Sequence, residues 1–316
     1  MSVLYDVPGP RQRRVTLIVS VIAAVVVLAG LYFFVYRPLD SKGQFSADLW
    51  GPLVDPSNEN FTQVWQRLGV GIRNTLRAAG LAIVASLLAG TLLAVLRIQL
   101  KSVARRRFTE FATPLSYLLR GLSGVLSAVT RACVEVFRGL PVVITIFFVA
   151  RGLPEFGASL STVWYLVIGL TIYNSVVLAE ILRSGMEGLP AGQTEAASAI
   201  GLSPLQTTRM ILLPQAYRIM LPALISQLVV VLKDTSLGFI ISYEETLNIG
   251  KQVIGVLDNP IQVYTVIAVM FITVNYSLSK LAQYIQRRLA RGRKTRTVAT
   301  GVAPDPAVAA EGAITP

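Results

Sequence analysis

The hydrophobic positions along the chain are grouped into six long runs separated by short polar segments. The first run, residues 15–36, contains no charged residue, and the others lie near residues 69–96, 134–150, 161–182, 219–242 and 263–285. A membrane-spanning helix needs about 20 mostly apolar residues. The pattern therefore predicts an all-α integral membrane protein with about six transmembrane helices, the third of them interrupted by Arg138 and Pro141.

The first run has a cleaved signal peptide as its alternative interpretation. It is long for the apolar part of such a peptide, and Arg37-Pro38 follows it in place of a small-x-small cleavage site. We therefore expect a retained helix over residues 15–36. The chain then divides into an extracytoplasmic loop at 37–68, a membrane core at 69–285 and a tail at 286–316 that is first basic and then disordered.

The distribution of Lys and Arg predicts the orientation in the membrane, since cytoplasmic segments are enriched in both. The basic N-terminus at 1–14, the segment after the second run and the tail are rich in Arg. The loops at 37–66 and 243–260 instead carry more acidic than basic residues. Both termini are therefore expected in the cytoplasm of a multi-pass protein of the cell membrane. Residues 101–123 fit either an amphipathic surface helix or the approach to the third span.

The composition excludes several classes of protein and several kinds of site. Hydrophobic residues make up 53% of the 316 residues and charged residues 15%, with a mean hydropathy of +0.60, which excludes an ordinary soluble enzyme. The net charge of +12 would suggest nucleic acid in a soluble protein, but membrane proteins carry such charge in cytoplasmic loops. With no His and only Cys133, His-based catalysis, His metal sites and an intrachain disulfide are excluded. We expect no catalytic residue, metal site or nucleic-acid partner.

Residues 188–214, between the fourth and fifth runs, predict two short helices rather than a plain loop. Gln193–Ile200 favours a helix, and Gly201 stands where a left-handed C-terminal cap belongs. Ser203 suits the N-cap of a second helix, with Pro204 at its first position and a Gln three residues after the cap. Pro214 is expected to end or kink this second helix.

This segment resembles the EAA loop of ABC-importer permeases. The matching positions are Glu195-Ala196-Ala197, Gly201, and Ile211, Leu213 and Pro214. A second similarity is narrower: the pattern Glu135, Arg138, Gly139 and Pro141 resembles the E-x-x-R-G-x-P entry to a core helix of the polar amino acid permeases. Ala179–Gly185, which contains Glu180 and Arg183, and Leu232–Leu237 also match that group. The similarity covers residues 70–285 and is greatest to actinobacterial glutamate permease subunits, whose family has five core spans; the first span would be peripheral.

The resemblance implies a division of labour. The chain has no G-x-x-x-x-G-K-[ST] motif, so it would bind no cofactor, and ATP and Mg²⁺ would be used by a separate ATPase dimer docked on the EAA loop. Gly201 would set the turn of that loop, and Glu195 would accept a hydrogen bond from the ATPase. A second permease subunit, identical or different, and an extracytoplasmic solute-binding protein would complete an importer of polar amino acids, with L-glutamate as the expected substrate.

Ionisable residues within the spans are the remaining candidates, because charge in a membrane is costly. Glu180 and Arg183 are expected to form a structural ion pair, with a role for Glu180 in the translocation path as the alternative. Lys233 and Asp234 point about 100° apart on a helix, so at least one should face the path or another helix. Further candidates for lining the path are Thr235, Ser236 and Asn174. An ATP-independent secondary transporter and a membrane-embedded enzyme are the competing functions. The EAA segment argues against the first, and the lack of His and of an acidic metal cluster argues against the second.

Overall fold

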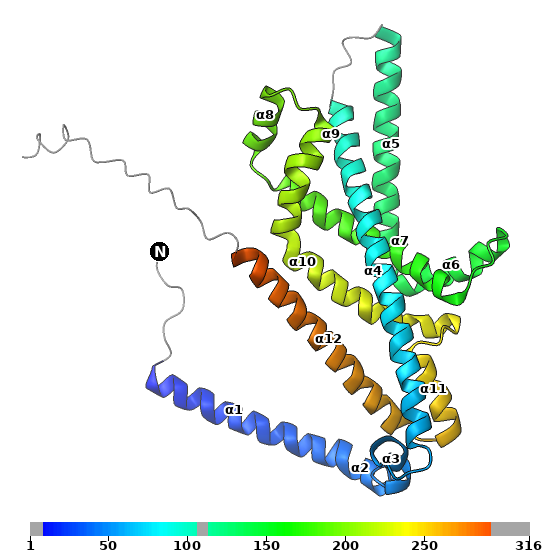
Figure 1. Ribbon diagram of the computed structural model, residues 1–316. Helices are drawn as coiled ribbons and strands as arrows, with labels where there is room; N and C mark the ends of the chain where they lie inside the picture. The colour runs from blue at the N-terminus through cyan, green and yellow to red at the C-terminus, as the bar shows by residue number, and fades with distance from the viewer. Residues whose placement is uncertain (1–8, 106–112, 292–316) are drawn as a thin grey trace, which may run out of the picture.

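The computed structural model describes residues 9–105 and 113–291, and within them the chain is entirely helical, with no strand (Figure 1). The elements in order are α1 (Pro10–Leu31), the π-helix η1 (Tyr32–Tyr36), α2 (Arg37–Ser41), α3 (Ala47–Val54), α4 (Phe61–Arg105), α5 (Thr113–Gly139), α6 (Val142–Glu155), α7 (Thr162–Glu187), α8 (Ala191–Ala199), α9 (Pro204–Thr207), the π-helix η2 (Thr208–Leu212), α10 (Leu213–Asp234), the 3₁₀-helix η3 (Thr235–Ile241), α11 (Thr246–Leu257) and α12 (Pro260–Arg291).

Five of the described helices are long and apolar enough to cross a membrane, and a sixth span results if the bent pair α5–α6 is counted as one. The first is continuous from Pro10 to Ser41, so the helix exceeds the apolar run at both ends. The second, α4, has 45 residues and a length of about 68 Å at 1.5 Å per residue, far more than the predicted span at 69–96. Hydropathy locates the part of a helix that crosses lipid, whereas the polar turns beyond it remain helical.

The interruption that the sequence predicts in the third span is a sharp bend between two helices. The chain bends by 106° between α5 and α6, and the break lies at Leu140-Pro141, where the helical assignment is interrupted. Pro141 has no backbone N–H and disfavours a helical conformation at the residue before it. Of the ambiguous segment 101–123, the first five residues continue α4 and residues from 113 onward begin α5; residues 106–112 lie outside the described residues.

Of the two outcomes expected at Pro214, an end or a kink, the helix does not end there. From Pro204 the chain remains helical through α9, η2, α10 and η3 to Ile241, a single run of 38 residues. The π-helical turn at Thr208–Leu212 directly precedes Pro214. A π turn adds a residue within the helix, which accommodates a proline that cannot donate to the preceding turn.

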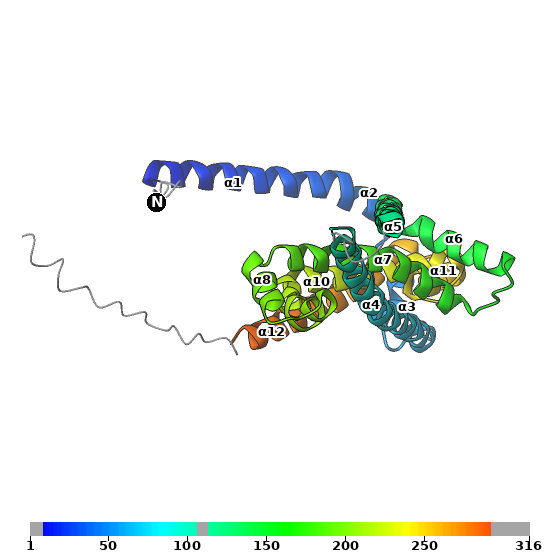
Figure 2. The same cartoon turned by 90° about the horizontal axis from the view of Figure 1, so that it is seen from above.

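Helix α7 lies at the centre of the bundle and packs against α4, α6 and α10 (Figures 1 and 2). Its Leu166, Leu170, Leu178 and Leu182 are fully buried. The contact with α4 is tight at Gly90, where a Cβ atom would lie 2.9 Å from the Leu178 Cβ. A glycine is needed there because the two helices approach each other too closely for a side chain.

The segment 37–68 is folded, and it joins α1 to the bundle. The Asn259 side chain donates to the Leu49 carbonyl at 2.9 Å, and Trp65 Nε1 donates to the Leu53 carbonyl at 3.1 Å. Helix α1 itself has no buried residue and lies apart from the other helices in both views (Figures 1 and 2). The bundle core is therefore formed by α4 to α12.

Candidate functional site: the coupling segment and the membrane core

The segment 188–214, here called the coupling segment, contains helix α8 and a sharp turn at Gly201. The Gly201 N–H donates to the Ser198 carbonyl, and the Leu202 N–H donates to the Ala197 carbonyl, both at 3.0 Å. This pair of bonds is the Schellman motif, which requires a left-handed residue. Gly201 has a φ of +80°, so the glycine stands where the backbone needs one.

A capping box begins the second helix of the coupling segment. The Ser203 side chain accepts from the Gln206 N–H at 3.3 Å, and the Ser203 N–H donates to Gln206 Oε1 at 2.8 Å. Pro204 occupies the first helical turn. The two caps fix the chain direction on both sides of Gly201, so the turn is specified by local sequence alone.

The coupling segment exposes apolar side chains on both sides of the Gly201 turn. Ile200 is 75% exposed, Leu205 53% and Met210 65%. Of the motif residues, Glu195, Ala196, Gly201 and Pro214 are exposed, Ile211 and Leu213 are half-buried, and Ala197 is buried. Exposed apolar residues gathered on one segment are typical of a surface that another protein covers.

The C-terminal part of α4 holds the coupling segment to the bundle. Gln99 Nε2 donates to the Thr208 hydroxyl at 2.9 Å and to the Pro204 carbonyl at 3.3 Å. These bonds reach across more than 100 residues of sequence, and no sequence motif marks Gln99. Sequence reasoning therefore missed this residue.

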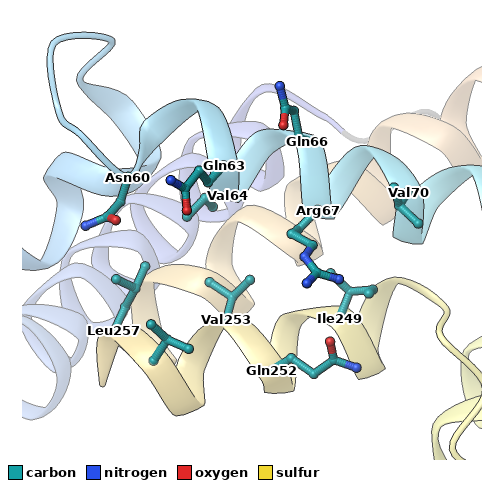
Figure 3. Close-up of a pocket in the computed structure, with 11 residues that line it drawn as sticks. Asn60, Gln63, Val64, Gln66, Arg67, Val70, Ile249, Gln252, Val253 and Leu257 are labelled. Carbon is teal, nitrogen blue, oxygen red and sulfur yellow. The ribbon is translucent and has the colours of Figure 1, made fainter.

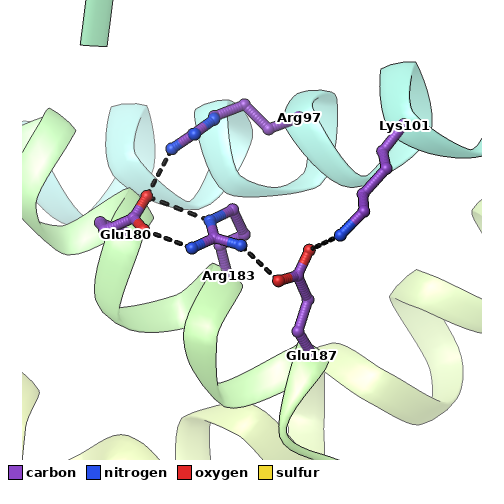
Figure 4. Close-up of polar contacts among 5 residues, drawn as sticks. All are labelled: Arg97, Lys101, Glu180, Arg183 and Glu187. Carbon is purple, nitrogen blue, oxygen red and sulfur yellow. Dashed lines mark hydrogen bonds and ion pairs between the residues drawn. The ribbon is translucent and has the colours of Figure 1, made fainter. Parts of the chain in front are cut away.

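Five charged residues form an ion network between α4 and α7 beside the coupling segment (Figure 4). Arg97 donates to Glu180 at 2.5 Å, and Lys101 to Glu187 at 2.6 Å. Arg183 lies between the two carboxylates and pairs with both. The expected Glu180–Arg183 pair is thus present, extended by partners that the sequence spacing could not reveal.

The motif residues Glu135, Arg138, Gly139 and Pro141 stand at the bend between α5 and α6. Gly139 is the last residue of α5, and Pro141 is the N-cap of α6. Arg138 lines a cavity of about 330 Å³ together with Glu180, Ser184 and Met220. The bend therefore places a guanidinium beside the Glu180 carboxylate at a largely apolar cavity between α7 and α10.

The candidate path residues differ in their exposure. Lys233 is exposed and Asp234 half-buried, and neither forms an ion pair within the described chain. Thr235 is buried and donates to the Leu232 carbonyl at 2.5 Å, whereas the half-buried Ser236 donates to the Lys233 carbonyl at 2.7 Å. Asn174 is buried and accepts from Gln227 at 2.8 Å. In this conformation Lys233 is the most accessible of the five.

A larger cavity, of about 620 Å³, lies between the start of α4 and α11 (Figure 3). Val64, Ile249 and Val253 form its apolar floor, and the Arg67 side chain extends across it toward α11. Nearby, the fully buried Glu245 caps α11 by accepting from the N–H groups of Leu247 and Asn248. Burial raises the pKa of Glu245 to about 7, and the two N–H groups partly oppose this rise.

Two named relatives have similar sequences. The chain is 37% identical over 272 residues to the glutamate transport system permease protein GluD of Corynebacterium glutamicum, covering 85% of this chain and 89% of the relative. It is 38% identical over 167 residues to a probable glutamine ABC transporter permease protein, GlnP, of Bacillus subtilis, covering 52% of this chain and 77% of that protein.

Solved structures share the fold. The structure of an amino acid ABC transporter with histidines matches with a TM-score of 0.58 and 24% identity, covering 72% of this chain and 96% of that one. A bacterial alginate ABC transporter in complex with a pentasaccharide-bound periplasmic protein matches with a TM-score of 0.55 and 15% identity, covering 88% and 96%. The family model described as binding-protein-dependent transport system inner membrane component matches residues 112–291. The chain therefore belongs to this family of membrane permease subunits of ABC importers, which lack an ATPase site of their own.

Proposed function

We propose that the chain forms the translocation path of an importer for polar amino acids, with L-glutamate as its substrate. The printed names of the two sequence relatives, one for glutamate and one for glutamine, support this substrate class. The observation that carries the proposal is the coupling segment, whose EAA-type residues flank a Gly201 turn and stand beside exposed apolar side chains. A self-sufficient transporter has no use for such a surface.

The coupling segment docks on a separate ATPase dimer, which binds ATP and Mg²⁺. Ile200 and Leu205 supply apolar area that docking removes from water, at about 25 cal/mol per Å². Glu195, which is exposed, offers an acceptor to a basic side chain of the ATPase. Closure of the ATPase dimer moves α8 and α9, and Gln99 carries this movement to α4.

The movement alternates access to a path that Lys233 and Asp234 line near the outer end of α10. An acidic amino acid is attracted by an exposed ammonium group, which suits Lys233. Thr235, Ser236 and Asn174 join the path only if the helices rearrange, since their polar groups are bonded within the bundle here. Glu180 belongs to the ion network and reaches the cavity lined by Arg138.

The remaining partners follow from this arrangement. A second permease subunit covers the exposed apolar faces, membrane lipid covers the rest, and a solute-binding protein delivers the amino acid to the outer face. Both termini lie in the cytoplasm, on the side of the coupling segment, because that segment must meet the ATPase. The structure of the alginate transporter with its periplasmic protein is the precedent for such delivery.

The experiment compares Ile200→Ser with the control Phe156→Ser. Phe156 precedes α7 and Ile200 follows it, and both side chains are strongly exposed, at 88% for Phe156 and 75% for Ile200. Co-purification of the ATPase subunit and uptake of radiolabelled glutamate are measured at equal membrane abundance. Both should fall for Ile200→Ser, while ATPase co-purification stays unchanged for the control. Uptake that persists without the ATPase would instead establish a secondary transporter, and ATP-dependent uptake of glutamine but not glutamate would refute the substrate.

A further inference from the structure

Two arginines on α4 have no partner in the described part of the chain. Arg73 and Arg77 are both exposed and make no hydrogen bond or ion pair there. They are four residues apart, so their side chains lie on one face of the helix. The same face continues with apolar residues that are also exposed, at 59% for Val84, 69% for Leu88 and 72% for Leu92. The face is thus two guanidinium groups followed by an apolar stripe.

The position of Arg77 along α4 marks a membrane boundary. The 19 residues 78–96 contain no charge and extend about 28 Å as a helix, close to the roughly 30 Å of a hydrocarbon core. Arg77 stands at one end of this run and Arg97 at the other. Packing places the start of α7 near the same boundary, because Ala78 of α4 and Val163 of α7 belong to one core cluster.

An aromatic residue marks the same boundary. Trp164, two residues into α7 from its first residue, is 45% exposed, and tryptophan is enriched at the interface between membrane and water. Arg97 at the opposite boundary is neutralised by Glu180 at 2.5 Å. Arg73 and Arg77 have no equivalent carboxylate among the described residues, so both guanidinium groups are available to an anion.

We propose that Arg73 and Arg77 bind the phosphate of a phospholipid in the leaflet next to the start of α4. Guanidinium groups donate in a planar fork that matches phosphate oxygens, and charge-assisted bonds of this kind are about twice as strong as neutral ones. The acyl chain lies along the exposed stripe of Val84 and Leu88, within the part of α4 that matches the hydrocarbon core. This site is independent of the transported substrate.

The test measures the lipid that stays with the full chain and its partner subunits, purified from membranes in mild detergent and analysed by native mass spectrometry. Arg73→Gln combined with Arg77→Gln should reduce retained phosphatidylglycerol by about tenfold, as expected for losing charge-assisted contacts. Arg67→Gln combined with Lys251→Gln removes the same charge away from the boundary and should leave retention unchanged. Arg73→Lys combined with Arg77→Lys, the lysine pair, keeps the charge without the planar fork and should give an intermediate value.

Unchanged lipid in the glutamine pair would overturn the proposal, as would an equal loss in the Arg67 and Lys251 control. If the glutamine pair instead loses the second permease subunit while lipid retention stays constant, the arginines bind a protein carboxylate and the lipid site is refuted. Should the glutamine pair fail to assemble, the lysine pair decides: retention equal to wild type excludes a guanidinium fork. None of these readouts depends on glutamate transport.

Discussion

Substitution of Gly201 isolates the contribution of backbone conformation to coupling. Its φ of +80° is left-handed, and an L-residue with a Cβ loses about 1–2 kcal/mol there. Asn tolerates this region better than Ala, and β-branched Val tolerates it worst. A Cβ at this position meets no atom within 4 Å, so the cost within the chain is conformational rather than steric. A loss of 1–2 kcal/mol lowers the ratio of turned to opened segment by about 5–30-fold.

The assay combines co-purification of the ATPase subunit with glutamate uptake for wild type, Gly201→Asn, Gly201→Ala and Gly201→Val at equal membrane abundance. Both readouts should decrease in the order Gly, Asn, Ala, Val. Contact between position 201 and a tightly fitting partner predicts a different order, because Asn is larger than Ala. If Ala retains more activity than Asn, or if Val equals wild type, the reasoning from the left-handed turn is refuted.

Three further predictions concern stability, measured by thermal unfolding of the purified chain in detergent. Gly90→Ala should lower the unfolding free energy by about 1–3 kcal/mol because its Cβ would lie 2.9 Å from atoms of α7, while Gly80→Ala, with nothing within 4 Å, should raise it by up to about 1 kcal/mol; equal effects would exclude close packing at Gly90. Glu180→Gln and Arg97→Gln should each lower the unfolding free energy. The loss in the double variant should be smaller than the sum of the two single losses by about 0.5–2 kcal/mol; strict additivity would show that the ion pair contributes nothing to stability. Burial raises the pKa of Glu245 from 4.5 to about 7, so the folded protein should be most stable below pH 4.5, where this carboxyl is protonated in both the folded and the unfolded state. The unfolding free energy should fall by up to roughly 3 kcal/mol as the pH rises through 7. Glu245→Gln should remove this part of the pH dependence, and a variant with the wild-type profile would contradict the prediction.

The features that the sequence predicts well are those encoded by neighbouring residues. Gly201 and Ser203 determine the coupling turn through bonds that span no more than five residues, so the pattern alone is sufficient. Apolar runs likewise locate the membrane-crossing parts of the helices. The apolar run at 69–96 includes Arg73 and Arg77, so it does not mark where the uncharged stretch 78–96 begins.

The features that the sequence could not predict depend on distant partners. The sequence marks an interruption at Pro141 but not the angle of 106° between α5 and α6, and the continuous helix through Pro214 contains a π turn that a proline rule does not anticipate. Arg97 and Glu180 are 83 residues apart, and periodicity carries no information about such a pair. Patterns among neighbouring residues therefore predict the helices, whereas the contacts between distant helices can be seen only in the packed structure.

Helix α4 connects the regions that the proposed transport cycle must coordinate. Its first turns line the 620 Å³ cavity with α11, Gly90 brings its middle against α7, and Gln99 holds the coupling segment at its inner end. No proline interrupts its 45 residues, and sharp kinks in helices are almost always found at proline or a comparable defect. A displacement of the coupling segment must therefore either move α4, and with it the cavity at its first turns, or break the hydrogen bonds of Gln99. Because the ion pair of Arg97 with Glu180 also joins α4 to α7, the two helices are expected to move together, so that both ends of the bundle change in the same step.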